Sequence, residues 1–472
     1  MSYCPFCKKP IELYWTYCHY CNKPLITNIN DNSLVNHSSF NEMEFHNGKG
    51  LYENFNGEEE ENDEDLKEID TKLSGLEKSG KSMGPLLLKK ASLFYKKHEY
   101  SSALKNLKLA LHNFEEDKDQ LNIAVCHNEL GLINEELGYY DQAIYHFDRS
   151  MNILETIADN QKLVQVLNNI GNIYFIINDL EQSYSYYQKA LSLAEKEKLE
   201  LEAVKSSSNL VEVLFLLKDH QRILKILKTN LEYFSNSHDF YGTALTLLKF
   251  GKVYYHLGEG YYDQAHNYLV DTLALINRIE HKITPLMKAR LEWECFLYLA
   301  KLNILWENDV EAENYLLKSL ELIRTFEIQN HINEGLVLEN IARFYSIKGE
   351  DNKAIDFFKL AIEIYEKYGN KIKIAELQKE IAEIFREFLQ DFEKAKIFYE
   401  KALETYETEH YYKESAEILN RLGEIYIEQK LIDLAIKSFK KAGRYYSEVK
   451  DEYNYTLLNQ KIKSLTKDQD ID

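Results

Sequence analysis

Small residues recur along most of this chain with a period close to 40 residues. They fall in three registers of Ala, Gly or Ser, separated by 12 and then 7 positions, as in Gly131, Ala143 and Ser150. Helix backbones approach closely only where the side chains between them are small. The pattern therefore predicts stacked hairpins, each made of two antiparallel helices, A and B. Aligned on helix A, the first register gives nine units, centred on Ala91, Gly131, Gly171, Val211, Gly251, Ala300, Ala342, Ala382 and Gly423.

Apolar spacing and composition indicate an all-α fold class. Between residues 85 and 465 the apolar residues recur with the period of a helix. The chain of 472 residues contains only 5 Pro and 18 Gly, which suits long helices, and breakers such as Gly138 and Gly349 mark the A–B turns. We expect a right-handed superhelical solenoid of about nine hairpins over residues 85–465, with a frayed tail over residues 466–472.

Two places depart from the repeat. The fourth unit carries Val211, Ile223 and Asn230 where small residues are expected, so its hairpin should pack more loosely than the others. The fifth and sixth anchors are 49 residues apart instead of 40. Within this longer junction, Thr284 followed by Pro285 is typical of a helix start, and we expect the A helix of the sixth unit to begin there.

The N-terminal segment has the cysteine spacing of a metal site. Cys4 and Cys7 form one Cys-x-x-Cys pair, and Cys18 and Cys21 form a second pair ten residues later. Four thiolates at this spacing favour a closed tetrahedral zinc site, and residues 1–25 resemble the short zinc-ribbon heads of many microbial proteins. A closed site leaves no ligand position for catalysis, so we expect structural Zn²⁺, with contact to nucleic acid as the alternative role.

Residues 26–84 have the composition of a flexible linker. They hold 14 acidic and 5 basic residues, many Asn and few apolar residues. Such a segment cannot bury enough apolar surface to offset the entropy lost on ordering. We therefore expect an acidic, Asn-rich tether, within which residues 66–76 form at most a transient helix.

Two stretches resemble the tetratricopeptide repeat family. The first runs from Asn128 to Phe147 and contains the turn Leu137–Gly138–Tyr139–Tyr140–Asp141, and the second runs from Asn168 to Leu191. The 40-residue step is longer than the usual ~34 residues and is similar to that of the G-protein-signalling-modulator proteins and of bacterial peptide-sensing regulators. The resemblance implies a helical solenoid that holds other proteins or peptides in a concave groove lined by the A helices.

Helical spacing around each anchor selects the side chains that should line this groove. Asn side chains can hold the backbone of an extended peptide through a paired donor and acceptor, and the cations of the fifth to eighth units would favour an acidic or C-terminal carboxylate segment. The alternative is that these cations are solvated and paired with nearby glutamates. The candidate groove residues are Asn128, Asn168, Asn172, Lys252, Lys301, Arg343, Lys379, Arg386 and Asn420.

The net charge and the motifs that the sequence lacks argue against several classes of function. A net charge of −20 argues against broad binding to a phosphate backbone, and no run of ~18 apolar residues predicts a membrane span. No catalytic triad or phosphate loop is visible, and residues 1–10 lack a secretion signal. We expect a cytoplasmic, non-enzymatic scaffold that binds a peptide or helix of a partner protein. The alternatives are a peptide-sensing regulator and a nucleic-acid-associated factor that uses the zinc ribbon, and self-association is left open.

Overall fold

The computed structural model describes residues 2–3, 10–11, 63–79, 82–326 and 331–469, and it divides the chain into two compact units. The N-terminal unit ends at Tyr261 and the C-terminal unit begins at Tyr262. In the N-terminal unit the elements are β1 (Ser2–Tyr3), β2 (Pro10–Ile11), α1 (Asp63–Ser79), α2 (Gly84–Lys96), α3 (Tyr100–Asp117), α4 (Gln120–Glu136), α5 (Tyr140–Ile157), α6 (Asn160–Ile176), α7 (Leu180–Lys196), α8 (Glu200–Leu216), α9 (His220–Asn236), α10 (Phe240–Leu257) and the 3-10 helix η2 (Glu259–Tyr261).

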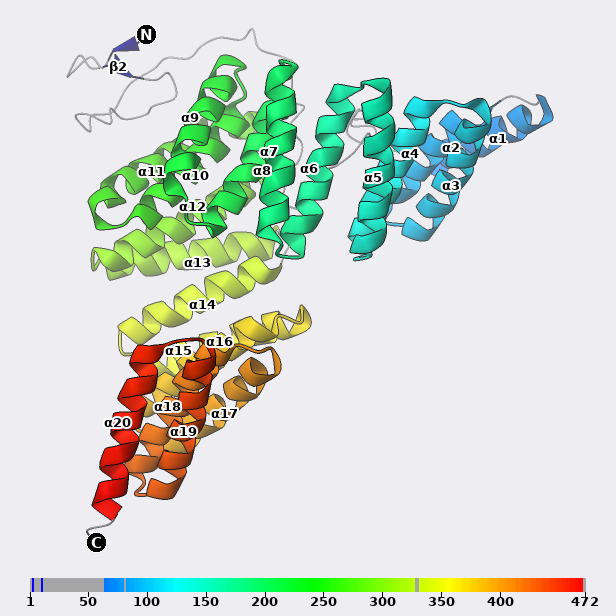
Figure 1. The fold of residues 1–472 in the computed structure, drawn as a ribbon. Helices are drawn as coiled ribbons and strands as arrows, with labels where there is room; N and C mark the ends of the chain where they lie inside the picture. Colours follow the sequence, from blue (N-terminus) through cyan, green and yellow to red (C-terminus); the bar gives the residue numbers. More distant parts are fainter. Residues whose placement is uncertain (1, 4–9, 12–62, 80–81, 327–330, 470–472) are drawn as a thin grey trace. The chain divides into compact units, whose positions relative to one another are not determined.

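The described elements of the C-terminal unit are all helices. Its elements are α11 (Tyr262–Ile279), the 3-10 helix η3 (Glu280–Lys282), α12 (Pro285–Leu305), α13 (Asp309–Thr325), α14 (His331–Ile347), α15 (Asp351–Lys367), α16 (Lys371–Glu387), α17 (Phe392–Thr408), α18 (Tyr412–Glu428), α19 (Ile432–Glu448) and α20 (Glu452–Gln469). Within each unit, helices that follow one another along the chain pack side by side as a stack of hairpins (Figure 1). The even-numbered helices from α2 to α18 are the A helices, the odd-numbered ones from α3 to α19 are the B helices, and α20 follows the last hairpin.

A short turn repeated at fixed intervals explains the 40-residue step. One residue in each turn from α2 to α10 has a left-handed backbone, and the N–H of the next residue reaches back to the preceding helix, as Tyr139 N–H does to the Asn134 carbonyl at 2.8 Å. That next residue also precedes the following helix, and Asp159 there accepts from the Lys162 N–H at 3.1 Å. A helix of 17 or 18 residues plus its turn takes 20 residues. The left-handed positions of the N-terminal unit are His98, Lys118, Gly138, Ala158, Asn178, Lys198, Lys218, His238 and Gly258.

The first register of small residues lies between the two helices of one hairpin, as predicted. A Cβ added at Gly131 of α4 would lie 2.5 Å from the Phe147 ring of α5. In the ninth hairpin, a Cβ at Gly423 would lie 2.4 Å from the ring of Phe439. Both rings are fully buried. A buried aromatic ring on helix B therefore fills the space that a small residue on helix A leaves open.

The fourth hairpin is packed less closely, in agreement with the prediction. α8 and α9 contact one another less extensively than the two helices of the other hairpins that lie within one unit. Val211 and Ile223 are fully buried at positions where small residues are expected, and their bulk keeps the backbones apart. Asn230 is also buried, and it is satisfied by Ser207 at 2.8 Å and Ser208 at 3.2 Å, both on α8. The division between the two units lies further along the chain, in the turn of the fifth hairpin.

The extended junction before the sixth hairpin ends at the predicted helix start. α12 begins at Pro285, and the Thr284 hydroxyl accepts the Met287 N–H at 3.2 Å. α12 has 21 residues, against 17 or 18 in the neighbouring A helices α10 and α14. This prediction from sequence is confirmed.

Little of the first 84 residues is described. β1 and β2 pair antiparallel, with Ser2 opposite Ile11 and Tyr3 opposite Pro10, whereas Cys4, Cys7, Cys18 and Cys21 lie outside the described residues. Within the predicted linker, α1 contacts α2 and buries Ile69. At the other end of the chain, α20 extends to Gln469, into the stretch expected to fray.

Candidate functional site

In the N-terminal unit, a row of neutral polar groups joins neighbouring A helices; we call it the amide row. The Asn169 side chain on α6 donates to Asn128 on α4 at 2.9 Å, and Asn168 on α6 donates to Ser206 on α8 at 2.9 Å. All four side chains are buried. The predicted groove residues Asn128 and Asn168 therefore hold adjacent hairpins together.

Asn172, one turn further along α6, is more accessible. Its side chain is half-buried, and its Oδ1 accepts from the Tyr187 hydroxyl of α7 at 2.6 Å. Of the three Asn predicted from α4 and α6, it is therefore the one placed to reach a partner without breaking a contact between A helices.

A buried carboxyl group lies near this tyrosine. Glu135 on α4 is 6% exposed, and neither of its carboxyl oxygens has a hydrogen-bond partner among the described residues. Burial, with a smaller contribution from Glu136, raises the pKa of Glu135 well above its ordinary value. Glu135 therefore favours its neutral form.

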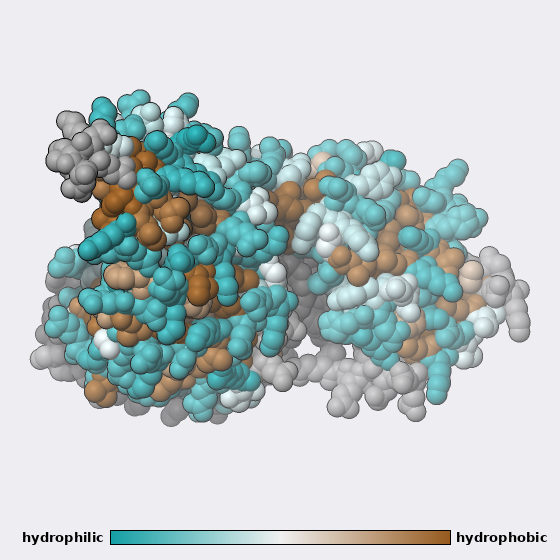
Figure 2. All heavy atoms as spheres, turned by 90° about the horizontal axis from the view of Figure 1, so that it is seen from below, coloured by the Kyte–Doolittle hydropathy of each residue, from teal (hydrophilic) through white to brown (hydrophobic). Residues whose placement is uncertain are grey.

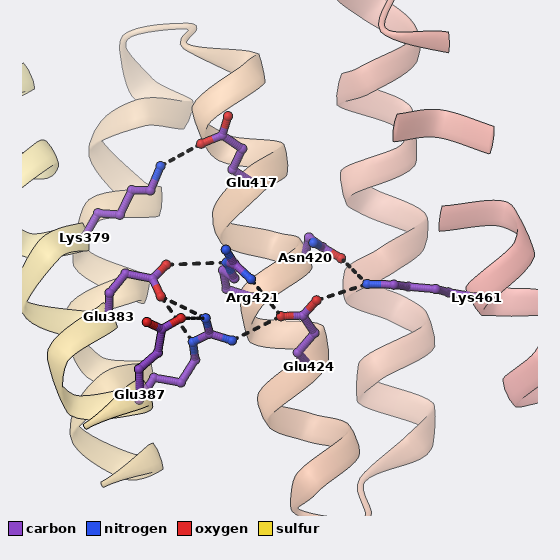
Figure 3. Close-up of polar contacts among 9 residues, drawn as sticks. Lys379, Glu383, Glu387, Glu417, Asn420, Arg421, Glu424 and Lys461 are labelled. Carbon is purple, nitrogen blue, oxygen red and sulfur yellow. Dashed lines mark hydrogen bonds and ion pairs between the residues drawn. The ribbon is translucent and has the colours of Figure 1, made fainter. Parts of the chain in front are cut away.

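In the C-terminal unit, ion pairs take the place of the amides; we call these residues the charged row. Lys379 on α16 pairs with Glu417 on α18 at 2.6 Å, and Glu383 on α16 pairs with Arg421 on α18 at 3.5 Å (Figure 3). The row continues to α20, where the Lys461 ammonium lies 3.0 Å from Glu424 on α18. The charged row consists of Glu339, Arg343, Lys373, Glu376, Lys379, Glu380, Glu383, Arg386, Glu387, Glu417, Asn420, Arg421, Glu424 and Lys461.

Arg386 has three ionic contacts in the charged row. Its guanidinium lies 2.6 Å from Glu387, 3.0 Å from Glu383 and 3.2 Å from Glu424 on the next A helix. Desolvation lowers its pKa, but the Glu383 and Glu387 carboxylates outweigh this effect, so that the pKa of Arg386 is raised. Each carboxylate thus shares a fixed cation with its neighbours, which holds the side chains in place.

Arg343 extends the charged row to α14. It binds both carboxylate oxygens of Glu380 on α16, with a shortest distance of 2.6 Å, and lies 3.8 Å from Glu339 on its own helix. Glu339 is almost fully buried, and this burial raises its pKa although Arg343 and Lys373 oppose the rise. Three of the five predicted groove cations, Arg343, Lys379 and Arg386, are therefore paired with glutamates, as the alternative interpretation expected.

The other predicted groove residues have different surroundings. The Lys252 ammonium lies 5.6 Å from the centre of the Phe215 ring, and the Lys301 ammonium lies 4.8 Å from that of Tyr298. Asn420 accepts from Lys461 at 3.4 Å (Figure 3). The ion pairs of the charged row connect α14, α16, α18 and α20, and a separate ion pair joins Lys249 on α10 to Glu212 on α8 at 3.3 Å.

Sequence reasoning overlooked several members of the charged row, including Glu380, Glu417, Arg421 and Lys461. A signal for them exists in the repeat. Opposite charges stand 37 or 38 residues apart in the pairs Arg343–Glu380, Lys379–Glu417 and Arg386–Glu424. This separation is shorter than the 40-residue repeat by about one helical turn. The reason is that the two side chains meet between adjacent A helices and do not occupy equivalent positions on them.

Two family models each match a part of the chain. The tetratricopeptide repeat family matches residues 164–197, and the soluble NSF attachment protein family matches residues 338–448. No curated protein matches the chain. In the described part of the chain, no helix combines the length and apolar character needed to cross a membrane.

Solved structures share the fold at low sequence identity. The apo form of the quorum sensor NprR from B. thuringiensis is 16% identical, with a TM-score of 0.50 over 76% of this chain and 98% of that one. Aspartyl phosphate phosphatase F from Bacillus subtilis is 18% identical, with a TM-score of 0.50 over 63% of this chain and 74% of that one. The described helices therefore share the fold of these structures, and residues 164–197 match the tetratricopeptide repeat.

Proposed function

We propose that this chain is a non-enzymatic scaffold or adaptor that binds a peptide or helix of a partner protein along its A helices. The observation that carries the proposal is the charged row. Apart from the buried Glu339, its side chains are partly or fully exposed, and ion pairs connect them from α14 to α20. A surface whose charged groups are already fixed loses little side-chain entropy when a partner binds.

The balance of charges in the row refines the kind of partner. Its six cations face seven carboxylates, so the row does not present a net positive surface. A purely acidic segment, as expected from the cations alone, would meet Glu383 and Glu424 as well as Arg386. The arrangement supports a segment that carries both signs and exchanges ion pairs with the row.

This proposal can be tested with peptides selected from a random library on the full chain. We expect Arg343→Glu combined with Arg386→Glu to weaken the selected peptides at least tenfold in fluorescence anisotropy. Lys359→Glu, on the B helix α15, is the matched control and should leave affinity unchanged. Equal binding to all three proteins would refute the charged row as the site.

A peptide-sensing regulator is the second candidate, because the chain shares its fold with a quorum sensor and is divided into two compact units. A regulator should change conformation when its peptide binds. Small-angle scattering of the full chain with a saturating selected peptide separates the two: a changed radius of gyration favours the regulator, and an unchanged one favours the scaffold.

We also propose that residues 1–25 bind one structural Zn²⁺ through Cys4, Cys7, Cys18 and Cys21, in a reducing, cytoplasmic compartment that keeps the thiols free. The pairing of β1 with β2 supports this, because it brings together the chain on both sides of the Cys4–Cys7 pair. Elemental analysis should find one zinc per chain, and Cys18→Ser should remove it. Under half a zinc per chain in the unaltered protein would refute the site, and filter binding with the same variant tests a nucleic-acid role.

A further inference from the structure

The most exposed hydrophobic side chains gather at the A–B turns. Among the described residues, eight large hydrophobic side chains are more than half exposed, and six of them lie at A–B turns. Of the other two, Tyr145 lies within α5 and Tyr453 lies at the turn after the B helix α19. The surface in Figure 2 likewise shows hydrophobic patches on a largely hydrophilic face. The six are Tyr139, Leu216, Leu217, Val310, Ile347 and Phe388.

Three of these side chains form one edge of the C-terminal unit. Val310 is 77% exposed, Ile347 is 69% exposed and Phe388 is 58% exposed, and they come from the sixth, seventh and eighth hairpins. An ion pair between Lys348 and Asp309 joins the sixth and seventh turns, directly beside Ile347 and Val310. We call this surface the turn-edge patch; it comprises Leu305, Trp306, Val310, Ile347, Phe388 and Leu389.

The spacing of the turn-edge patch matches one face of an α-helix. Consecutive A helices of this unit touch through pairs such as Arg343–Glu380, which implies that neighbouring hairpins are about 10 Å apart. Residues seven positions apart on a helix are also about 10 Å apart and share one face. A helix laid across the three turns can therefore place one apolar residue against each hairpin.

The charges at the turns indicate which polar residues the docked helix should carry and in which direction it should lie. The turns contain seven carboxylates and four cations over residues 305–311, 347–353 and 388–396. The excess lies at the sixth turn, where Glu307 and Glu311 have no cationic partner in the described part of the chain. Basic residues near one end of the helix would complement these two carboxylates, whereas the acidic turns disfavour an anionic membrane surface.

We propose that the turn-edge patch docks an amphipathic helix of a partner protein, with apolar residues seven positions apart and a basic end against Glu307 and Glu311. This surface is separate from the charged row on the A helices, so the inference does not depend on the function proposed above. The chain would then hold two different segments at once, as a scaffold does.

The test uses the full chain and a fluorescein-labelled 22-residue model helix. The helix carries leucine at seven-residue intervals, lysines at one end and alanine and glutamine elsewhere; a second peptide has glutamates in place of the lysines. In fluorescence anisotropy we expect the lysine peptide to bind at least tenfold more tightly than the glutamate peptide. Glu307→Lys with Glu311→Lys should remove most of that difference.

Variants of the patch decide whether the site is the one proposed. Ile347→Asp with Phe388→Asp should weaken the lysine peptide at least tenfold, while Leu317→Asp on α13 and Arg343→Glu in the charged row should change its affinity less than twofold. Equal binding of the two peptides, or no loss in the double variant, would overturn the proposal. So would light scattering showing a dimer that the double variant dissociates, since a second copy would then occupy the patch.

Discussion

Neighbouring A helices are joined by different chemistry in the two units of this chain. In the N-terminal unit the contacts of α4 and α6 with the next A helix include buried, neutral pairs, as in Asn169–Asn128 and Asn168–Ser206, and one ion pair, Lys249–Glu212 at 3.3 Å, joins α10 to α8. In the C-terminal unit they are half-exposed ion pairs, as in Lys379–Glu417 and Arg386–Glu424. The apolar packing beneath is the same, with an aromatic ring of helix B seated against a small residue of helix A.

The comparison separates what builds the stack from what can vary on it. Small residues and rings fix the distance between helices, whereas the polar groups have only to satisfy one another across it. Neutral buried contacts should be insensitive to salt. Half-exposed ion pairs should weaken as salt rises, because mobile ions screen them.

The largest expected effect tests the shared packing. Phe147→Ala in the N-terminal unit and Phe439→Ala in the C-terminal unit should each cost about 3–5 kcal/mol, because each removes a fully buried ring. Hydrogen exchange of α4–α5 and of α18–α19 would measure the two losses separately. Tyr145→Ala, at an exposed position of α5, is the control. Clearly unequal losses would show that the units do not share one packing scheme.

The next effect concerns the buried acid of the N-terminal unit. Because the raised pKa of Glu135 keeps its proton on the folded chain, the stability it confers is full below its ordinary pKa of 4.5 and is lost as pH rises through the raised pKa. Glu135→Gln should flatten this decline and stabilise the N-terminal unit by about 1–3 kcal/mol at pH 7. Urea unfolding at several pH values would measure it, with Glu155→Gln, at an exposed position of α5, as the control. A destabilised Gln variant would mean that the carboxylate has a partner.

A smaller effect distinguishes the two polar rows directly. A double-mutant cycle on Arg386 and Glu424 should give a coupling of about 1 kcal/mol at low salt that largely disappears at ~1 M salt, where screening acts within ~3 Å. A cycle on Asn128 and Asn169 should give a similar coupling at both salt concentrations. If the two coupling energies change with salt to the same extent, the contrast between the amide row and the charged row is wrong.

The sequence predicted the repeat well because small residues at helix contacts leave a clear periodic signal. Gly131 and Gly423 lie against the rings of their own B helices, and Thr284 caps α12 as expected. Helical spacing alone could not predict which of the candidate groove residues are buried. Asn128 and Asn172 both satisfy the spacing, but only the structure shows that Asn128 is buried against α6 and that Asn172 is half-exposed. The residue of the next A helix with which a side chain such as Arg343 pairs likewise depends on the register between A helices.

The smallest effect tests a feature that the two units have in common. Ala158 and Lys450 have left-handed backbones, with φ of 57° and 59°, a conformation that costs a non-glycine residue about 1 kcal/mol. Ala158→Gly and Lys450→Gly should each stabilise their unit by about 0.5 kcal/mol, since relief of that strain exceeds the entropy that glycine adds to the unfolded chain. Gly138→Ala, where φ is 75°, should destabilise by a similar amount. Thermal unfolding would measure all three, and a stabilised Gly138→Ala would show that the turn conformation does not set the 20-residue interval between helices.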